Sequence, residues 1–306
     1  TVGLLVRELV EEGWLNESEL VTTGSLGRRP TPLHIDSQRL ALIGADVGVD
    51  SARVVVCSLL GDVVDRADIA YDDATDPKGC LKLVCKQIIR LAKRAQSLGR
   101  RTLGVGVGLH GGVDDSTGML HIAPNMGWRH VPAGALVREQ LASTALEGLP
   151  LFLQNEADVA ALAEFEFVSR PAPDPLVYLS LGHGVGAGVI VRDKLLTGYR
   201  GFAGEVGHAV LQAGGPPCSC GRRGCAEALI GLRALVSGAP GDAPSKSKKA
   251  LDKLFAAVDA GDIAALKSVR TAGRHLGVLL NNLWVSFDPM RIVLGGPALR
   301  LGDALL

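Results

Sequence analysis

The segment "LALIGADVGV" (residues 40–49) is an apolar run of the kind that forms a buried β-strand, and it opens an alternation of strands and helices. A second strand is predicted at 53–60, a helix near 79–98 and another strand at "LGVGVGLH" (103–110). The stretch "LPLFLQNEADVAALAEF" (149–165) then indicates a further passage from strand to helix. The first half of the chain therefore has the pattern of an α/β protein.

The second half of the chain repeats this alternation. An apolar strand is predicted at "LVYLSLGHGVGAGVIV" (176–191), and a long helix around 262–286 precedes a strand at "RIVLGG" (291–296). Since the alternation occurs in both halves, we predict two α/β lobes, at residues 37–153 and 154–306.

Composition limits the classes of function. The chain has 306 residues, 47% of them hydrophobic, and its 32 Lys and Arg residues equal its 32 Asp and Glu residues. The net charge is therefore zero and gives no indication of a nucleic acid or membrane partner, so any basic surface must be local. No apolar run approaches the length of a membrane span, and no signal-peptide pattern opens the chain. We therefore expect a cytoplasmic protein with reduced thiols, and we expect that pieces of the natural protein are missing at both ends.

A cluster of potential metal ligands lies in "GHAVLQAGGPPCSCGRRGCAE" (207–227). It holds His208, Cys218, Cys220 and Cys225, which include half of the chain's six cysteines. Four such ligands suffice for a closed, tetrahedral structural zinc site. A disulfide within Cys-Ser-Cys would be strained, and the spacing is not the C-x-x-C of redox proteins. Free surface thiols are the alternative to zinc.

Two carboxylates flank this cluster. Glu205 precedes His208 by three residues, and Glu227 follows Cys225 by two. Carboxylates accept hydrogen bonds from paired hydroxyls, so a metal-braced pocket with these side chains would suit a sugar ring. The alternative is that both are solvated surface charges.

The longer stretch "GFAGEVGHAVLQAGGPPCSCGRRGCAE" (201–227) strongly resembles the signature of the ROK family, which comprises bacterial sugar kinases and sugar-responsive transcriptional repressors. "APNMGW" (123–128) resembles its sugar loop, "NEADVAALAE" (155–164) its catalytic helix and "LGHGVGAGVI" (181–190) its second phosphate loop. The resemblance implies an actin-like (ribonuclease H-like) two-lobed ATPase fold, a structural Zn²⁺ and a sugar in the cleft. The sugar contacts that it implies are Asn125, Asn155, Glu156, Glu205, His208 and Glu227.

The phosphate-binding motifs depart from those of the family's kinases. Where the kinases read D-x-G-G-T, this chain has Asp46-Val47-Gly48-Val49-Asp50. Val49 adds bulk where backbone N–H groups must approach phosphate, and Asp50 adds a negative charge. The second loop has His183 where the kinases have a small hydroxyl residue.

The position of the catalytic base differs too. The kinases have Asn-Asp, and this chain has Asn155-Glu156. One extra methylene moves the carboxylate by more than about 1 Å, and a misplacement of that size costs on the order of a hundredfold in rate. We predict that sugar binding is retained and that the capacity for phosphoryl transfer is not.

The N-terminal residues 1–36 resemble the end of a winged helix-turn-helix domain, as found in the family's repressors. A helix over 2–12 would be the recognition helix, with Thr1, Gly3, Leu4 and Arg7 facing the major groove while Val2, Leu5, Val6 and Leu9 pack inward. Two short strands would flank the turn "GSLGRRP" (24–30), whose Arg28 and Arg29 would contact the minor groove or phosphates. The alternative for the arginine pair is ordinary solvated surface.

These observations together predict a sugar-responsive, DNA-binding transcriptional repressor of carbohydrate metabolism. It would bind a monosaccharide or a derivative in the cleft without phosphorylating it, and it would form a homodimer or homotetramer on operator DNA without a membrane partner. Ligand binding would bias lobe closure and so change the placement of two winged domains. One alternative is an active, glucokinase-like ATP-dependent sugar kinase. Another is a sugar-binding protein without a DNA role.

Overall fold

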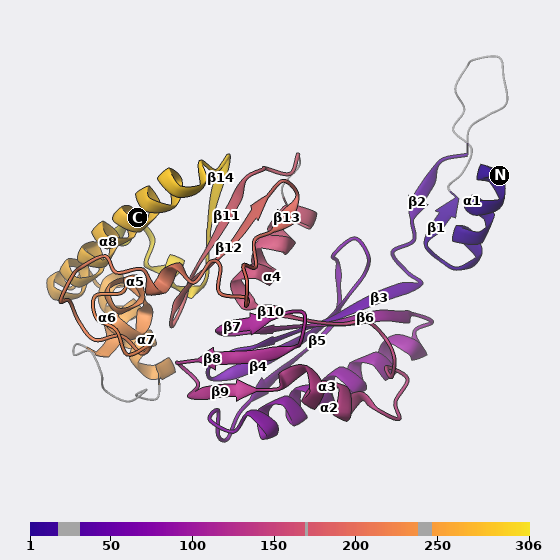
Figure 1. Cartoon of the computed structure of the whole chain (residues 1–306), viewed down its shortest axis with the longest axis horizontal. Coiled ribbons are helices and arrows are strands. Elements are labelled where there is room, and N and C mark those ends of the chain that lie inside the picture. Colours follow the sequence, from indigo (N-terminus) through magenta and orange to yellow (C-terminus); the bar gives the residue numbers. More distant parts are fainter. Residues whose placement is uncertain (18–30, 169–170, 238–246) are drawn as a thin grey trace, which may run out of the picture. The chain divides into compact units, whose positions relative to one another are not determined.

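The structure is a computed structural model that describes residues 1–17, 31–168, 171–237 and 247–306. These residues form two compact units (Figure 1): unit 1 comprises residues 1–109 and 132–153, and unit 2 comprises residues 110–131 and 154–306. Both units combine strands with helices, as the alternating pattern predicts. Within the described ranges, no helix is long and apolar enough to cross a membrane.

Unit 1 is built on a five-stranded sheet with the order β10-β6-β3-β4-β5. β3 pairs antiparallel with β4, which pairs antiparallel with β5, whereas β3 and β6 run parallel. The bounds are β3 Leu40–Val47, β4 Ser51–Cys57, β5 Val63–Ala70, β6 Arg101–Leu109 and β10 Leu151–Asn155. The predicted strand at 40–49 is therefore the central strand of the sheet.

Two helices, α2 (Pro77–Ser97) and α3 (Ala133–Leu141), pack together in unit 1 and cover one face of this sheet (Figure 1). α2 begins where Asp76 accepts a hydrogen bond from the Lys78 backbone N–H and Pro77 occupies the first turn. Its buried stripe recurs at helical spacing and consists of Cys80, Leu81, Val84, Cys85, Ile88, Leu91, Ala92 and Ala95. Cys80 and Cys85 are thus buried small hydrophobic residues.

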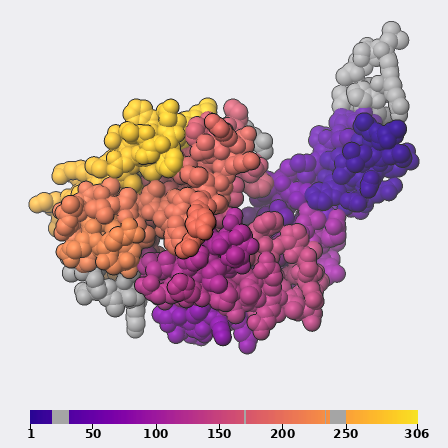
Figure 2. All heavy atoms as spheres, viewed as in Figure 1, coloured from indigo at the N-terminus to yellow at the C-terminus, as the bar shows by residue number. Residues whose placement is uncertain are grey.

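The N-terminal residues form α1 (Val2–Glu11) and a hairpin of β1 (Leu15–Glu17) with β2 (Leu33–Ile35). The Arg39 guanidinium donates to the carbonyls of Val10 and Glu11 at 3.0 and 3.2 Å, and so caps the end of α1. The predicted inward face of α1 is wrong at Val2 and Leu5, which are 79% and 56% exposed. Among the described residues, the short hairpin and the Arg39 side chain contact the helix, and α1, indigo in Figure 2, has no buried residue.

Unit 2 contains a four-stranded sheet with the order β13-β12-β11-β14. Its strands are β11 Leu176–Leu181, β12 Val185–Val191, β13 Lys194–Leu195 and β14 Arg291–Gly295. The predicted single strand at 176–191 is therefore an antiparallel hairpin, with Gly182, His183 and Gly184 as its turn. β11 also pairs parallel with β14.

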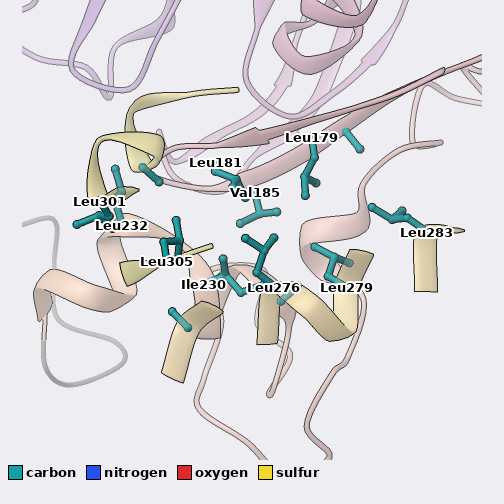
Figure 3. Close-up of a cluster of buried hydrophobic side chains, with 14 of the residues drawn as sticks. Leu179, Leu181, Val185, Ile230, Leu232, Leu276, Leu279, Leu283, Leu301 and Leu305 are labelled. Carbon is teal, nitrogen blue, oxygen red and sulfur yellow. The ribbon is translucent and has the colours of Figure 1, made fainter. Parts of the chain in front are cut away.

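The two faces of this sheet carry different helices. α4 (Glu156–Ala163) packs on one face of β11 and β12 and continues into a π-helical turn at Glu164–Val168. The other face packs on α5 (Ala226–Ile230) and α8 (Ile263–Phe287), and residues of all three elements form the main core of unit 2 (Figure 3). The remaining helices are α6 Leu232–Ser237, α7 Ser247–Asp259 and the 3-10 segments Val206–His208 and Pro297–Ala304.

A second, three-stranded sheet of unit 2 consists of β7 (Gly112–Asp114), β8 (Met119–Ala123) and β9 (Trp128–Val131). The sequence places these strands in the first lobe, but residues 110–131 group with unit 2. Contacts with a loop much later in the chain account for this difference. The His121 ring stacks on the Phe202 ring at 5.6 Å, and Gly201 lies directly against the Val113 backbone.

A row of glycines lies on one face of β12. Gly184, Gly186 and Gly188 alternate with Val185, Ala187 and Val189, which belong to the core on the opposite face. A Cβ at Gly188 would collide with α4, 2.9 Å from the Asp158 Cα, and one at Gly186 would lie 3.3 Å from the Ala157 Cβ. The glycine row therefore permits the close approach of α4 to the strand.

Leu179→Ala should lower the free energy of unfolding by about 2–5 kcal/mol, because Leu179 is 0% exposed in the core of unit 2 and its truncation leaves a cavity. Chemical denaturation measures this change. Val285→Ala on α8 is the control, since Val285 is 73% exposed and should change stability by less than about 0.5 kcal/mol. Equal effects of the two substitutions would contradict the placement of this core.

Candidate functional site

The cysteine and histidine cluster forms within one loop region of unit 2. His208 lies at the end of the 3-10 turn Val206–His208, and the chain returns through an isolated bridge between Val210 and Cys225. The ligand atoms of His208, Cys218, Cys220 and Cys225 all lie within 4.8 Å of one another. The structure thus brings together all four residues that the sequence predicts as zinc ligands.

Two distances within the cluster match the edges of a tetrahedral zinc site. His208 Nδ1 lies 3.6 Å from Cys218 Sγ, and Cys220 Sγ lies 3.8 Å from Cys225 Sγ. A tetrahedron with Zn–S near 2.3 Å and Zn–N near 2.0–2.1 Å requires edges of about 3.6 Å for N–S and about 3.8 Å for S–S. Burial raises the pKa of the Cys218 thiol to about 12, and zinc binding would remove this proton. Four protein ligands leave no open position for water, so such a zinc would be structural.

His208 faces two groups at once. Its Nδ1 atom points to the cysteines, and its Nε2 atom lies 3.8 Å from a carboxylate oxygen of Glu205. Both side chains are largely buried, with 15% and 23% of their surface exposed. The imidazole can therefore bind zinc through one nitrogen and hold a hydrogen on the other toward Glu205 or a ligand.

Glu227 is held by three donors. The Ser219 hydroxyl donates to Oε1 at 2.8 Å, the Asn125 amide donates to the same oxygen at 3.4 Å, and the Val185 backbone N–H donates to Oε2 at 3.3 Å. A Cβ at Gly184 would collide with Oε2 and lie 3.2 Å from Asn125 Nδ2. The carboxylate thus lies directly against Gly184, where a larger residue would displace it from this position. Because Ser219 is between two cysteines of the cluster, this bond joins the cluster to Glu227.

The start of α4 supplies Asn155 and Glu156. The Asn155 side chain caps the helix by accepting from the Ala157 N–H at 2.7 Å, and its amide donates to the Gly111 carbonyl at 3.0 Å. Glu156 Oε1 lies 3.6 Å from His110 Nδ1, and Glu156 Oε2 also accepts from the Ala157 N–H. Asn155 therefore has a positioning role in this structure, with one amide hydrogen and one lone pair remaining for a ligand.

Several carboxyl groups in this region repel one another. Burial, with the nearby carboxylates of Glu156 and Glu227, raises the pKa of Glu205 to about 7. Burial also raises the pKa of Asp158 to about 8, with contributions from Glu156, Glu205 and Asp115. Asp158 is 2% exposed, and its Oδ1 atom has no hydrogen-bond partner among the described residues. The site is therefore acidic, and it favours ligands that donate hydrogen bonds.

Each of the two turns that resemble the kinase phosphate loops has one glycine N–H group that is already bonded. In unit 1, the Gly48 N–H donates to the Ser51 carbonyl at 2.9 Å, and Asp46 and Asp50 are exposed beside it. In unit 2, the Gly182 N–H donates to the Gly184 carbonyl at 2.9 Å. Each turn thus satisfies within itself a backbone donor that a phosphate-binding loop would direct to the ligand.

The predicted DNA contacts are described only in part. Thr1, directly before α1, and Arg7 on α1 are exposed, and their contact with DNA remains a prediction. Arg28 and Arg29 lie outside the described residues, so the assignment of the turn remains a prediction.

Three residues of the site are not evident from the sequence motifs. The motifs give no role to Ser219, Asp158 or His110. Two signals in the sequence could have indicated Ser219 and Asp158. Ser219 lies between two cysteines, and Asp158 is an acidic residue inside an apolar helix motif.

Cys220→Ser should remove zinc from the purified protein, because a hydroxyl replaces one of four ligands. Loss of the metal should also weaken sugar binding by about a hundredfold or more, since each loop residue released regains about 1–2 kcal/mol of backbone entropy. Metal analysis and sugar titration of the same sample measure both effects. Cys57→Ser in β4, outside the cluster, is the control that should change neither. A folded, zinc-free Cys220→Ser protein with full sugar affinity would show that cluster and site are independent.

Asp158→Asn should stabilise the protein more at pH 8 than at pH 5. The pKa of Asp158 is raised from 3.8 to about 8 in the folded state, so its carboxyl keeps a proton that the unfolded chain releases above about pH 4. The free energy of unfolding therefore falls as pH rises between about 4 and 8, by at most about 1.4 kcal/mol per pH unit. An amide does not titrate and removes this dependence.

Urea denaturation of wild type and variant at both pH values tests this expectation. Asp114→Asn is the control, because the Ser116 hydroxyl lowers the pKa of the exposed Asp114 and no gain at high pH is expected there. An Asp158→Asn protein whose stability follows pH as wild type does would mean that Asp158 is ionised when folded.

Comparisons with known proteins extend this description. The family model described as "ROK family" matches residues 42–305. The xylose repressor of Caldicellulosiruptor bescii is 30% identical over 321 residues, which cover 100% of this chain and 78% of that protein. The glucokinase of Halalkalibacterium halodurans is 30% identical over 281 residues, which cover 86% of this chain and 82% of that protein.

Solved structures show the same fold. The crystal structure of a ROK family transcriptional regulator, a homologue of the E. coli MLC protein, matches with a TM-score of 0.78 at 23% identity, over 99% of this chain and 77% of that one. A ROK family glucokinase from Streptomyces griseus, in complex with glucose and AMPPNP, matches with a TM-score of 0.72 at 29% identity, over 87% and 86% of the two chains. The fold is therefore the actin-like, two-lobed α/β fold of these proteins.

The family model spans nearly the whole chain, and the motifs at 123–128, 155–164, 181–190 and 201–227 all lie within its match. The chain belongs to the ROK family.

Proposed function

We propose that the protein is a sugar-responsive transcriptional repressor that binds a monosaccharide or a derivative in unit 2 and does not phosphorylate it. The observation that carries this proposal is the state of the two phosphate-loop turns: the Gly48 and Gly182 N–H groups are bonded within their own turns, and Asp50, where the family's kinases have a hydroxyl residue, is exposed beside the first. The Asp50 carboxylate repels a triphosphate, and a bonded N–H must break its bond before it can bind one.

The sugar-binding half of the proposal rests on the donor and acceptor set of unit 2. Glu227, Glu205 and Glu156 present carboxylate oxygens, and Asn125 and His208 present donors beside them. Sugar hydroxyls both donate and accept, so this mixture suits a polyol. Among relatives, repressors named for xylose match the whole chain, so xylose is the first monosaccharide to test.

Zinc in this proposal is structural, held by His208 and the three cysteines, and it supplies rigidity to the loop that carries Glu205 and Glu227. Glu227 accepts from sugar hydroxyls while Ser219 keeps its orientation. The Nε2 atom of His208 faces the same space as Glu205 and holds a hydrogen toward the ligand.

The DNA-binding half rests on the N-terminal residues 1–36 and on the repressors among the relatives. In the proposal, α1 is the recognition helix with Thr1 and Arg7 toward the major groove, and Arg28 and Arg29 contact phosphates or the minor groove. The protein works in the cytoplasm on operator DNA as a homodimer or homotetramer. An active sugar kinase is the second candidate, because glucokinases are about as similar in sequence.

DNA binding by the full-length protein tests the proposal. On DNA from the promoter region of its own gene, xylose should change the affinity. Arg28→Ala with Arg29→Ala should weaken binding and reduce the slope of log affinity against log salt by about one unit for each phosphate that the two arginines neutralise. Arg270→Ala with Arg274→Ala on α8 removes the same charge from exposed positions elsewhere and is the matched control.

An assay of ADP release with xylose and glucose decides between the candidates. We expect no sugar-dependent release. Turnover of roughly 1–100 per second would make the protein a kinase. Sugar binding with neither ADP release nor DNA binding would instead favour a sugar-binding protein without a DNA role.

A further inference from the structure

A pocket of about 590 Å³ lies in unit 2 beside the proposed sugar contacts, and it is lined by residues from four segments. These are Gly112 of β7, Ile122 and Pro124 of the β8 region, six residues of the loop after β13 (Phe202, Gly204, Glu205, Val206, His208 and Ala209), and Cys220 and Arg222 of the cysteine loop. Of the six proposed sugar contacts, only Glu205 and His208 line it. The pocket therefore extends from one side of the monosaccharide site, and the monosaccharide contacts do not account for it.

Phe202 is held rigidly at this pocket. Its ring is 42% exposed, and it stacks on the His121 ring with centroids 5.6 Å apart and planes at 29°. The ring also lies directly against Gly112, where a Cβ would be 2.6 Å from Cζ. An exposed, immobilised aromatic ring beside hydroxyl-binding groups is a platform for the apolar face of a sugar ring, since binding costs it little side-chain entropy.

The charges around the pocket disfavour an anionic ligand. Glu205 is the single carboxylate among its lining residues. Arg222 is the single guanidinium among its lining residues. A phosphate group would bring about 1.5–2 negative charges into the pocket. A neutral group with hydroxyls fits better, because the guanidinium can donate to hydroxyl oxygens.

The size of the pocket indicates how large that group is. A volume of about 590 Å³ lies within the range of roughly 300–1,000 Å³ that holds drug-sized ligands, and it lies beside the monosaccharide contacts. From the pocket, its Phe202 platform and its charge, we propose that the effector is a neutral disaccharide. Its second sugar ring occupies this pocket, stacked on Phe202 and hydrogen-bonded to Arg222. This inference rests on the proposed sugar-binding function and names its ligand class.

Titration calorimetry of the zinc-loaded protein tests the proposal. The probes are xylose, glucose, xylobiose, cellobiose, maltose and glucose 6-phosphate. At least one disaccharide should bind about tenfold or more tightly than its own monosaccharide, because the second ring adds stacking and hydrogen bonds. Glucose 6-phosphate should bind more weakly than glucose.

Variants then locate the second ring. Phe202→Ala should lower the affinity for the preferred disaccharide about tenfold and change that for the monosaccharide less than about twofold, whereas Phe202→Trp should retain the preference. Phe167→Ala is the matched control, since Phe167 is 48% exposed and does not line the pocket. Arg222→Gln should also reduce the preference, and the neighbouring Arg223→Gln, outside the lining, should not. Zinc analysis of each variant verifies that the cysteine loop is intact.

The outcomes separate the disaccharide inference from the sugar-binding function on which it rests. Monosaccharide binding without any advantage for a disaccharide overturns this inference and leaves the proposed function standing. A disaccharide advantage that survives Phe202→Ala and Arg222→Gln also overturns it, because the second ring then lies elsewhere. Tighter binding of glucose 6-phosphate than of glucose overturns the inference that the ligand is neutral. If no sugar in the panel binds, the proposed function fails as well.

Discussion

The glycine row of β12 is the constraint on which the rest of the site depends. Gly184, Gly186 and Gly188 leave one face of the strand without side chains, so α4 and the Glu227 carboxylate approach the backbone directly. The opposite face carries Val185 and the other apolar residues of the core. One strand therefore anchors unit 2 on one face and positions the acidic groups on the other. A side chain at Gly188 would collide with the backbone of α4 and push the helix away from the strand.

Direct contacts join the cysteine cluster to the acidic groups. His208 has one nitrogen toward the cysteines and the other toward Glu205, and the Ser219 hydroxyl, from between two cysteines, orients Glu227. Anything that orders the cluster therefore orders both carboxylates. Burial, and after it the closeness of other carboxyl groups, raises the pKa of Glu205 and of Asp158. A site with this charge selects ligands by their hydrogen-bond donors, which is the chemistry that separates sugars from phosphates.

Much of this protein follows from local sequence pattern. The strand at 40–49, the amphipathic helix near 79–98 and the long helix around 262–286 were predictable because periodicity reflects which side of an element is buried. The cysteine cluster was predictable for a different reason: its ligands lie within eighteen residues of one another, so the chain between them can close on one ion with few alternatives. The glycine alternation of β12 is also visible in the sequence, although its apolar run hides the turn at Gly182 to Gly184 and predicts one strand where the structure has two.

Only the tertiary structure decided the features that depend on distant contacts. Residues 110–131 group with unit 2 because His121 and Val113 pack on a loop about eighty residues further along the chain, and no local pattern encodes that. The burial of Asp158 and the immobilisation of Phe202 have the same origin. Hydrophobic periodicity indicates whether a side chain is buried. Long-range packing determines which residues bury it, and therefore also its pKa or its role as a ligand platform.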